Sequence, residues 1–478
     1  MLLKSYLMLL IKIIMKNKSR IFYLFIFSLF LFFLSKHTGM FWDNVLFASK
    51  MGNYLYNHSL FNWYFPDSFD PGHPPFLAFI QALGWKILGH KLWVSHLMLL
   101  SFIFGLLYQI SSLINHYIED TKYRILAFLL LISDPTFLTQ LIIINPEVIQ
   151  LFFFFMAINA ILKDNTKLKT VSLFFLSIVS FRGMMLCGGV LLFDILRYIF
   201  INKQTLLSFL NLKNIISYSI GAIPGLSFII WRLLTKGWLQ THPNSPWEDC
   251  WHLVNIKEFL MNLIILGHRY ADFGRIGILI FVGLLFIFKI NFFKNKNIKD
   301  VGLLTISSVF FIIIVSLIST NPFGHRYFIA SYLSLSLIAA LLLVQLKKKK
   351  QFWFIVLIFN LLLGNLWIYP ETIAQGWDAS LAHIPYYSLR EKTIDYLDKN
   401  NIEIEQIETF FPNVSSLDEI NLCGDKRKFK KFTGTSEYIF YSNVYNLSDN
   451  EYDILKNKYH PIKTFKKGSI YIKILKKN

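Results

Sequence analysis

Several motifs that mark common enzyme families are missing from this sequence of 478 residues. It has no glycine-rich phosphate loop, no Cys-x-x-Cys pair, no nucleophile elbow and no convincing internal repeat. These absences argue against a P-loop nucleotide hydrolase, a thioredoxin-like redox protein and an α/β-hydrolase. The three cysteines, Cys187, Cys250 and Cys423, are too few for a disulfide framework.

Charged residues are also scarce, at 16% of the chain, whereas 54% of the residues are hydrophobic and 48 are phenylalanine. With a mean hydropathy of +0.47, the chain has more apolar segments than one water-soluble core can bury. Runs such as "IFYLFIFSLFLFFLS" and "VGLLTISSVFFIIIVSLIS" have the length and composition of membrane helices. The composition therefore predicts a polytopic α-helical membrane protein.

The net charge of +19 does not indicate a nucleic-acid-binding surface. Lysine and arginine gather in short gaps between apolar runs, at 163–169, 289–300 and 347–350. Such gaps stay in the cytoplasm under the positive-inside rule, whereas a nucleic-acid surface would concentrate its charges in one folded domain. We therefore expect membrane lipids around the chain and no nucleic-acid partner. The first apolar run lacks a small-x-small cleavage site and is interpreted as a retained helix.

The apolar runs predict about eleven membrane helices. We place them at 20–35, 92–115, 125–144, 148–162, 169–181, 184–200, 213–233, 275–289, 301–319, 327–346 and 352–369. With the N-terminus in the cytoplasm, every Lys-rich gap falls inside and the residues after 369 fall outside. We expect a transmembrane domain over 1–369 and an extracytoplasmic domain over 370–478.

This topology leaves a long first outer loop, at about residues 36–91, which contains the unusual segment "PDSFDPGHPPFLAF". The start of the loop, 40–57, has helical amphipathicity, and Asp43 lies on its polar side. Residues 76–89 are too short to span a bilayer comfortably, so we place them along the membrane interface. The prolines of "DPGHPP" interrupt any helix and should present Asp70 and His73 on a rigid loop.

Ionisable residues recur at the outer ends of the predicted helices. Glu147 follows a proline, Arg182 lies in "FRGMM", and His325 and Arg326 lie in "FGHRYF". Ionisable residues at membrane-helix ends are candidates for function, although each alone could be a solvated loop residue or, for Arg182, a snorkelling side chain. We expect these acids and cations to converge on one membrane face.

Several segments resemble bacterial protein-mannosyltransferase-like glycosyltransferases. They are "FWDN" (41–44), "DPGHPPFLAFIQALGWKILG" (70–89), "SDPTFLTQLIIINPEVIQLFFFFMAINAIL" (133–162) and "HRYFIASYLSLSLIAALLL" (325–343). That family belongs to the polyprenyl-phosphate-dependent class with the GT-C fold, which also includes the aminoarabinose transferases that act on lipid A. The resemblance covers about residues 20–370 and implies a GT-C-like catalytic domain over 1–369.

The resemblance implies transfer of a sugar from a polyprenyl-phosphate donor to an envelope lipid, glycan or protein on the outer face of the bacterial plasma membrane. It maps the catalytic acid of the first loop onto Asp43. The family often has Asp-Glu there, whereas this chain has Asp43-Asn44. It maps a second catalytic acid onto Glu147, in a register that could instead place Asn145 there.

The residues themselves could support such a reaction. Arg182, Arg326 or a metal ion could neutralise the departing phosphate, and one carboxylate, for which Asp43 is our first choice, suffices as the base. We expect substrate-binding roles for Asp70, His73, Arg182, His325 and Arg326. Asp70, His73 and Glu147 could hold a divalent cation, although their spacing is not diagnostic of a metal site.

Two other functions stay open as alternatives. A polysaccharide polymerase or ligase also uses lipid-linked sugars, but a large late outer loop would be typical of it. A lipid or glycolipid transporter would carry ionisable residues near the bilayer midplane and paired broken helices, neither of which the sequence indicates.

The composition changes to a soluble pattern at about residue 370. The segment "SLREKTIDYLDKNN" predicts an amphipathic helix, and "IEQIETFFP", "SEYIFYSNVY" and "GSIYIKILKK" predict strands. We therefore expect 370–478 to form a small α/β domain outside the membrane. In this topology Cys250 and Cys423 share an oxidising compartment, so a disulfide between them is one hypothesis.

Overall fold

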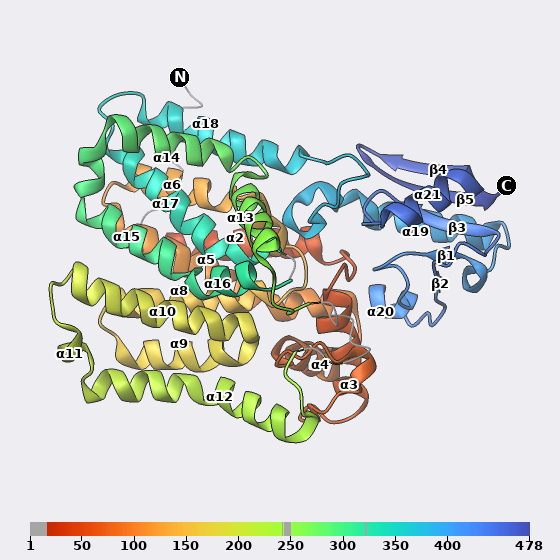
Figure 1. The fold of residues 1–478 in the computed structure, drawn as a ribbon, viewed down its shortest axis with the longest axis horizontal. Helices are drawn as coiled ribbons and strands as arrows, with labels where there is room; N and C mark the ends of the chain where they lie inside the picture. Colours follow the sequence, from red (N-terminus) through yellow and green to blue (C-terminus); the bar gives the residue numbers. More distant parts are fainter. Residues whose placement is uncertain (1–16, 241, 243–249, 321–322) are drawn as a thin grey trace.

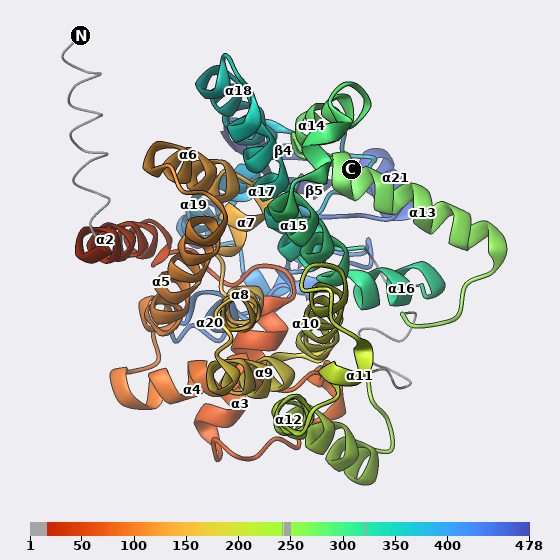
Figure 2. The same ribbon diagram turned by 90° about the vertical axis from the view of Figure 1, so that its left-hand side faces the viewer.

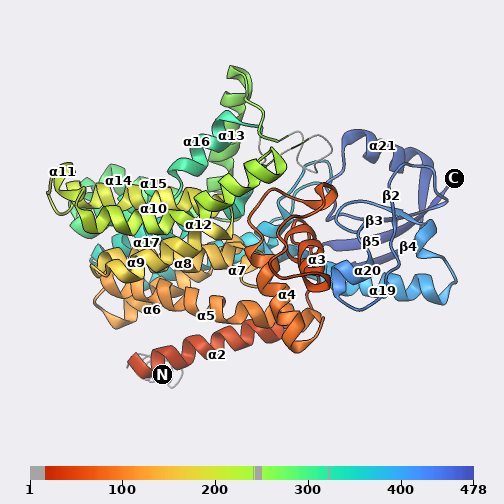
Figure 3. The same cartoon turned by 90° about the horizontal axis from the view of Figure 1, so that it is seen from below.

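The computed structural model describes residues 17–240, 242, 250–320 and 323–478. A helical body built from the first three-quarters of the chain carries a small sheet at one end (Figure 1). We call that end of the helical body the sheet end, and the opposite end the far end. The connections α8–α9, α10–α12, α14–α15 and α17–α18 lie at the far end, and they include the Lys-rich gaps of the sequence (Figures 1 and 3).

The described part of the chain has five helices that are long and apolar enough to cross a membrane alone. They are Leu92–Tyr117 (α5), Phe181–Phe200 (α10), Leu212–Lys236 (α12), Lys296–Ile318 (α15 and α16) and His325–Gln345 (η4 and α17). A bent pair, Ile256–Ala271 (α13) and Ile276–Phe288 (α14), adds one candidate if it counts as a single span. The chain is thus a multi-pass membrane protein.

The other helices of the body are shorter. They are Asn17–Ser35 (α2), Met51–Asn57 (α3), Phe76–Leu88 (α4), Thr121–Ile132 (α6), Pro135–Gln140 (α7), Glu147–Leu162 (α8), Thr166–Val179 (α9), Leu206–Phe209 (α11) and Lys350–Leu363 (α18). Every span predicted from the sequence falls on one of these helices or on a pair of them. The π-helical turn Val45–Lys50 (η1) leads into α3. Helix α4 lies across the bundle axis, as expected for an interfacial helix (Figure 2).

The structure corrects two of the predicted helices. The span 125–144 breaks between α6 and α7, because Pro135 lacks an N–H and Asp134 caps α7 by accepting the Phe137 amide at 3.0 Å. The span 301–319 is interrupted between α15 and α16, where the Ser308 hydroxyl donates to the Thr305 carbonyl at 2.9 Å, although the two helices together still form one candidate membrane span.

Helix α13 occupies a region that the sequence analysis treated as outer loop. Its N-terminus has a capping box, in which Asn255 and Glu258 each bond the other's backbone amide. The chain then turns by 94° between α13 and α14. Phe273 and Gly274 have positive φ values of 50° and 82° in this turn.

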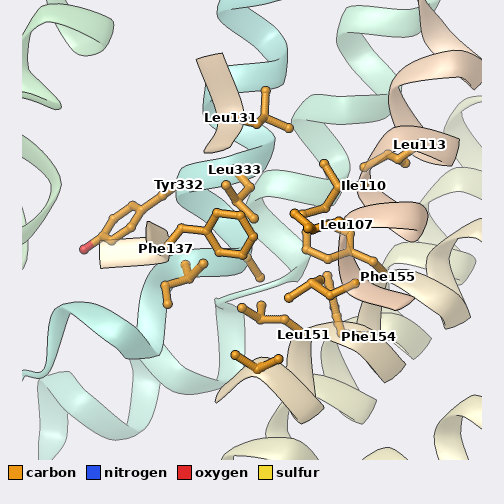
Figure 4. Packing of buried hydrophobic residues seen from close by; sticks show 14 of the residues in the cluster. Leu107, Ile110, Leu113, Leu131, Phe137, Leu151, Phe154, Phe155, Tyr332 and Leu333 are labelled. Atoms are coloured by element: carbon orange, nitrogen blue, oxygen red, sulfur yellow. The ribbon is translucent and has the colours of Figure 1, made fainter. Parts of the chain in front are cut away.

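The core of the helical body is a continuous cluster of branched and aromatic side chains. Figure 4 shows part of it, where Leu107 and Ile110 of α5 lie near Phe154 and Phe155 of α8. Residues of α8 and α17 are buried almost all around, because other helices surround these two on every side. This packing fixes the helix ends from which the polar residues of the sheet end project.

The C-terminal region forms a five-stranded sheet in the order β2-β1-β3-β5-β4. The strands are Glu408–Thr409 (β1), Lys430–Lys431 (β2), Tyr438–Ser442 (β3), Tyr459–Lys467 (β4) and Ile470–Lys477 (β5). The helices beside them are Pro385–Lys399 (α19), Leu417–Asn421 (α20) and Asp449–Lys458 (α21). Strand β1 pairs in parallel with β2 and β3, whereas β5 pairs antiparallel with β3 and β4.

The predicted strand segments contain β1, β3 and β5, and the predicted amphipathic helix lies within and just after α19. Strand β4 was not predicted, because "YHPIKTFKK" is an exposed edge strand with a proline and no buried alternation. The disulfide hypothesis is wrong for this structure: Cys250 and Cys423, like Cys187, form no disulfide.

Candidate functional site

A cavity of about 320 Å³ lies at the sheet end, where the helical body meets the residues that follow α18. Both the first loop and the segment before the sheet contribute to its wall. The polar and aromatic residues lining it include Trp42, Asp43, His73, Arg182, Arg269, Arg326, Tyr327, Gln375, Trp377, Asp378 and Asn446. The predicted convergence of acids and cations from separate loops therefore occurs in the structure.

Arg326 is the centre of the charged wall. Its guanidinium contacts three carboxylates, through Nη2 to Asp43, through Nη1 to Asp378 and through Nε to Glu147 at 3.1 Å. One positive charge cannot neutralise three negative charges, so Arg326 alone does not balance its partners; Arg182 and Arg269, which line the same cavity, supply the other positive charges.

Glu147 supplies the connection to a second guanidinium. Its Oε1 accepts a hydrogen bond of 3.0 Å from Nη2 of Arg182 and also faces Nε of Arg326. Arg182 in turn stacks over the Tyr327 ring, 4.0 Å from its centroid. Glu147 lies behind these two arginines and does not line the cavity. The sequence predicts that Glu147, like Asp43, is a catalytic acid. Its position behind the two arginines is instead typical of a residue that orients them.

Asp43 owes its place to the "FWDN" segment. The Phe41 side chain is buried against the C-terminal domain and stacks on His383, with 4.7 Å between ring centroids. Trp42 has a φ of 56°, the left-handed region that costs energy for a bulky residue. The Asp43 carbonyl then accepts the amides of Leu46 and Phe47 at 2.9 Å, which starts η1. The sharp turn aims the carboxylate at Arg326.

The "DPGHPP" loop presents His73 and Pro71, but not Asp70, to the cavity. Asp70 is 0% exposed and lies 3.0 Å from Nη2 of Arg232 on α12. Its Oδ1 also accepts the Gly72 amide at 2.9 Å. Gly72 has a φ of 80°, and a Cβ there would lie 2.7 Å from the Gln240 backbone. Asp70 therefore lies outside the cavity wall and anchors the loop to α12, so its predicted contact with substrate stays a prediction.

His73 faces the cavity beside three guanidinium groups. Burial, and then the nearby charge of Arg182, hold the pKa of His73 well below its ordinary value of 6.5. The ring is therefore neutral at pH 7. The Phe181 amide approaches Nδ1 at 3.5 Å, which favours the tautomer with the proton on Nε2.

His325 was also predicted to bind substrate, but the structure places it behind the wall. Its Nε2 pairs with Asp272 at 2.8 Å, and the side chain is buried. The pair holds the short helix His325–Phe328 (η4), which carries Arg326, against the turn between α13 and α14. His325 is thus a support for Arg326.

The residues predicted to hold a divalent cation do not assemble. The carboxylate of Asp70 is committed to Arg232, and that of Glu147 to Arg182 and Arg326. Throughout the described residues no group of three or more His, Cys, Asp or Glu side chains could hold a metal ion. These residues therefore do not fit a metal, and no step of the proposed chemistry uses one.

Sequence reasoning missed two charged residues of the wall. Asp378 lies in "GWDAS", after the last predicted span, in the short helix Trp377–Ala379 (η6). Arg269 lies in the last turn of α13, and its Nε donates to the Phe323 carbonyl at 2.8 Å. The capping box of α13 is the signal that would have placed Arg269 on a helix, whereas nothing adjacent to Asp378 reveals its partner.

Comparisons with known proteins support the fold. No family model matches the chain, and no curated protein matches its sequence. Two solved structures do match: crystal structures of ArnT from Cupriavidus metallidurans, bound to undecaprenyl phosphate and in the apo state. They align with TM-scores of 0.53 and 0.51 over 96% of this chain and 98% of that chain, at 11% and 10% identity.

ArnT is an aminoarabinose transferase with the GT-C fold. The alignment covers both the helical body and the sheet, so this chain is a GT-C-like polytopic membrane protein with a C-terminal domain. The resemblance inferred from the sequence is confirmed at the level of the fold. At 10–11% identity the likeness does not extend to substrates.

Proposed function

We propose that this protein is a glycosyltransferase that moves a sugar from a polyprenyl-phosphate donor to an envelope lipid, glycan or protein. The observation that carries the proposal is the convergence of Asp43 with Arg182, Arg269 and Arg326 on one cavity. A carboxylate and several cations on the wall of one cavity are what this reaction requires. One fold neighbour, ArnT, was crystallised with undecaprenyl phosphate bound, which supports a donor of this class.

Arg269 is our candidate for the first contact with the donor phosphate. Among the ion pairs of the described residues none includes Arg269, so its charge is available to a ligand. Arg182 lines the same cavity and has an Nε without a hydrogen-bond partner. Two guanidiniums on one wall suit the dianion that a departing polyprenyl phosphate becomes.

The proposed step is a displacement at the anomeric carbon of the sugar. The bond from that carbon to the phosphate oxygen breaks, and its electron pair leaves with the polyprenyl phosphate. The acceptor hydroxyl oxygen forms the new bond to the carbon, and its proton moves to Asp43. Arg326 holds Oδ2 of Asp43, so Oδ1 is the oxygen that would accept the proton. The neutral His73 can donate an Nε2–H to the sugar or the phosphate.

We further propose a bacterial plasma membrane location, with a cytoplasmic N-terminus and the C-terminal domain outside. The support is that the Lys-rich connections lie together at the far end, while the cavity and the sheet lie at the sheet end (Figure 1). A reporter that is active only in the cytoplasm, fused after Asn478, should be silent. Activity of that reporter would reverse the orientation.

The function is tested with the purified full-length protein in nanodiscs. Undecaprenyl-phosphate-linked sugars serve as donors, and envelope extracts from cells that lack the protein serve as acceptors. Mass spectrometry should detect a glycosylated product and free undecaprenyl phosphate. Asp43→Asn keeps the shape of the side chain but removes the base, so turnover should fall by about two to four orders of magnitude.

Asp67→Asn is the matched control, because Asp67 lies in the same loop but outside the cavity wall. Near-normal transfer by Asp43→Asn together with loss of transfer in Asp67→Asn would show that the base is elsewhere. A ladder of products that differ by one repeat unit would instead identify a polymerase. Movement of the donor across the bilayer without a covalent product would identify a transporter.

A further inference from the structure

Asp378 lies in the segment that links the last membrane helix to the sheet, yet its carboxylate reaches into the cavity. Its Oδ2 contacts Nη1 of Arg326, while Asp43 contacts Nη2 of the same guanidinium. Both acids line the cavity. The cavity wall therefore includes an acid from the segment that follows the last membrane helix.

The position of Asp378 is fixed by hydrogen bonds to a helix of the body. The Asp378 carbonyl accepts from Gln140 Nε2 at 2.9 Å, and the Ala379 carbonyl accepts from Thr136 Oγ1 at 3.0 Å. Both donors belong to α7. Gly376 lies so close to His325 that a Cβ would be 3.0 Å from the ring Nδ1. Such docking holds the carboxylate in one place.

The two acids compete for one cation. Arg182 partly balances Glu147, which leaves Arg326 to be shared between Asp43 and Asp378. If Asp43 had Arg326 to itself, the ion pair would stabilise its ionised form and make it a weaker proton acceptor. A second carboxylate on the same guanidinium reverses part of that effect.

We propose that Asp378 is a positioning acid of the site: it occupies one edge of Arg326, prevents Asp43 from pairing with that guanidinium alone, and thereby leaves Asp43 a better proton acceptor. The role of Asp378 in proton transfer rests on the proposed function. The sharing of Arg326 by Asp43 and Asp378 is independent of the proposed function and is tested separately.

The sharing is tested by thermal melting of four full-length proteins in nanodiscs: wild type, Asp43→Asn, Asp378→Asn and the double variant. Each single change leaves Arg326 one of the two acids, so each should lower the melting temperature only slightly. The double change leaves the buried Arg326 with Glu147 alone, so its loss should exceed the sum of the single losses. Losses that simply add would overturn the proposal.

The role in the reaction is tested by pH–activity profiles in the transfer assay. Asp378→Asn should lower kcat by about tenfold to a hundredfold with little change in KM for the donor. The acid limb of its profile should move to lower pH, because Asp43 then has Arg326 to itself. A merely structural role would lower activity by the same factor at every pH, and that result would contradict the proposal.

Asp425→Asn is the matched control. Asp425 also pairs with an arginine, Arg427 at 2.8 Å, but it does so on the surface of the C-terminal domain. Its melting temperature and pH profile should match those of the wild type. If the wild type transfers no sugar from any donor, the proposed function fails, while the melting comparison still decides whether the two acids share Arg326.

Discussion

Arg326 and Arg275 are both buried arginines at the sheet end, and they are partnered in opposite ways. Arg275 forms two parallel hydrogen bonds to one carboxylate, that of Asp134, at 2.7 and 3.0 Å. Its guanidinium also stacks on the Tyr332 ring, 3.9 Å from the centroid. Arg326 instead divides one charge among three carboxylates on the wall of a cavity.

The difference lies in how each buried arginine is balanced. The Arg275–Asp134 pair is matched one to one and bidentate, which is how a protein buries charge with the least penalty. Arg326 is shared by three carboxylates, and Oε2 of Glu147 is buried without a hydrogen-bond partner among the described residues. A buried polar group that shares or lacks a partner is a candidate for a functional role.

The largest expected effect comes from breaking the matched pair. Asp134→Asn leaves Arg275 as a buried cation without a counter-charge and should destabilise the protein by about 3–5 kcal/mol. It also removes the charged cap of α7. We expect little folded protein by size-exclusion chromatography in detergent. Replacing both partners, with Asp134→Leu and Arg275→Met, should recover part of the loss; equal losses in the single and double variants would contradict this account.

The apolar runs of the sequence predicted most of the helical body, because membrane helices are defined by length and composition. They did not reveal the interruptions at Asp134, which caps the start of α7, and at Ser308, which lies between α15 and α16. Asp43 could be predicted from the "FWDN" segment and its place after the first helix. Its partner Arg326 lies 283 positions away, and only the fold brings the two together.

Asp70 and Asp378 show the limit of sequence reasoning most clearly. Asp70 stands beside a histidine and prolines and resembles a ligand, but the end of α12 supplies Arg232 to neutralise it. Asp378 stands alone in a polar stretch and resembles a loop residue, but α7 docks it into the cavity. The neighbouring sequence shows the type of residue, but its role depends on a charged partner that lies far away in the sequence.

The next effect concerns Glu147, which belongs to the unmatched cluster. Glu147→Gln keeps the shape that bridges Arg182 and Arg326 but removes the charge. We expect kcat to fall by about tenfold to a hundredfold, because both guanidiniums lose their shared anchor. The melting temperature should change much less than in Asp134→Asn, since Arg326 keeps Asp43 and Asp378. If Glu147→Gln destabilised the protein as much as Asp134→Asn, the Arg326 cluster and the Arg275–Asp134 pair would not differ in the way described.

A smaller effect should appear in the pH dependence of stability. The folded protein holds the pKa of His73 well below 6.5, whereas the unfolded chain has the ordinary value. Below pH 6.5 the unfolded state therefore binds the proton first, so this residue lowers stability as the pH falls. Between pH 7 and pH 5, His73→Gln should lose less melting temperature than the wild type. Equal losses of melting temperature would show that neither burial nor the cavity cations lower the pKa of His73.

The smallest effect should come from Asp67, which lies three residues before Asp70 and is paired in a different way. Its side chain is 54% exposed and meets Nζ of Lys236 at 2.6 Å. The hydrogen bond from Lys236 lowers the pKa of Asp67 from 3.8, so any stabilisation is present at neutral pH and is lost as the pH falls below that value. Solvent screens an exposed pair, and Lys236 keeps the Phe65 carbonyl at 2.6 Å and Asp70 at 3.8 Å as partners. Asp67→Asn should therefore cost less than about 1 kcal/mol in denaturant unfolding at pH 7. A loss of stability comparable to that of Asp134→Asn would show that the exposed Asp67–Lys236 pair contributes as much as the buried Asp134–Arg275 pair.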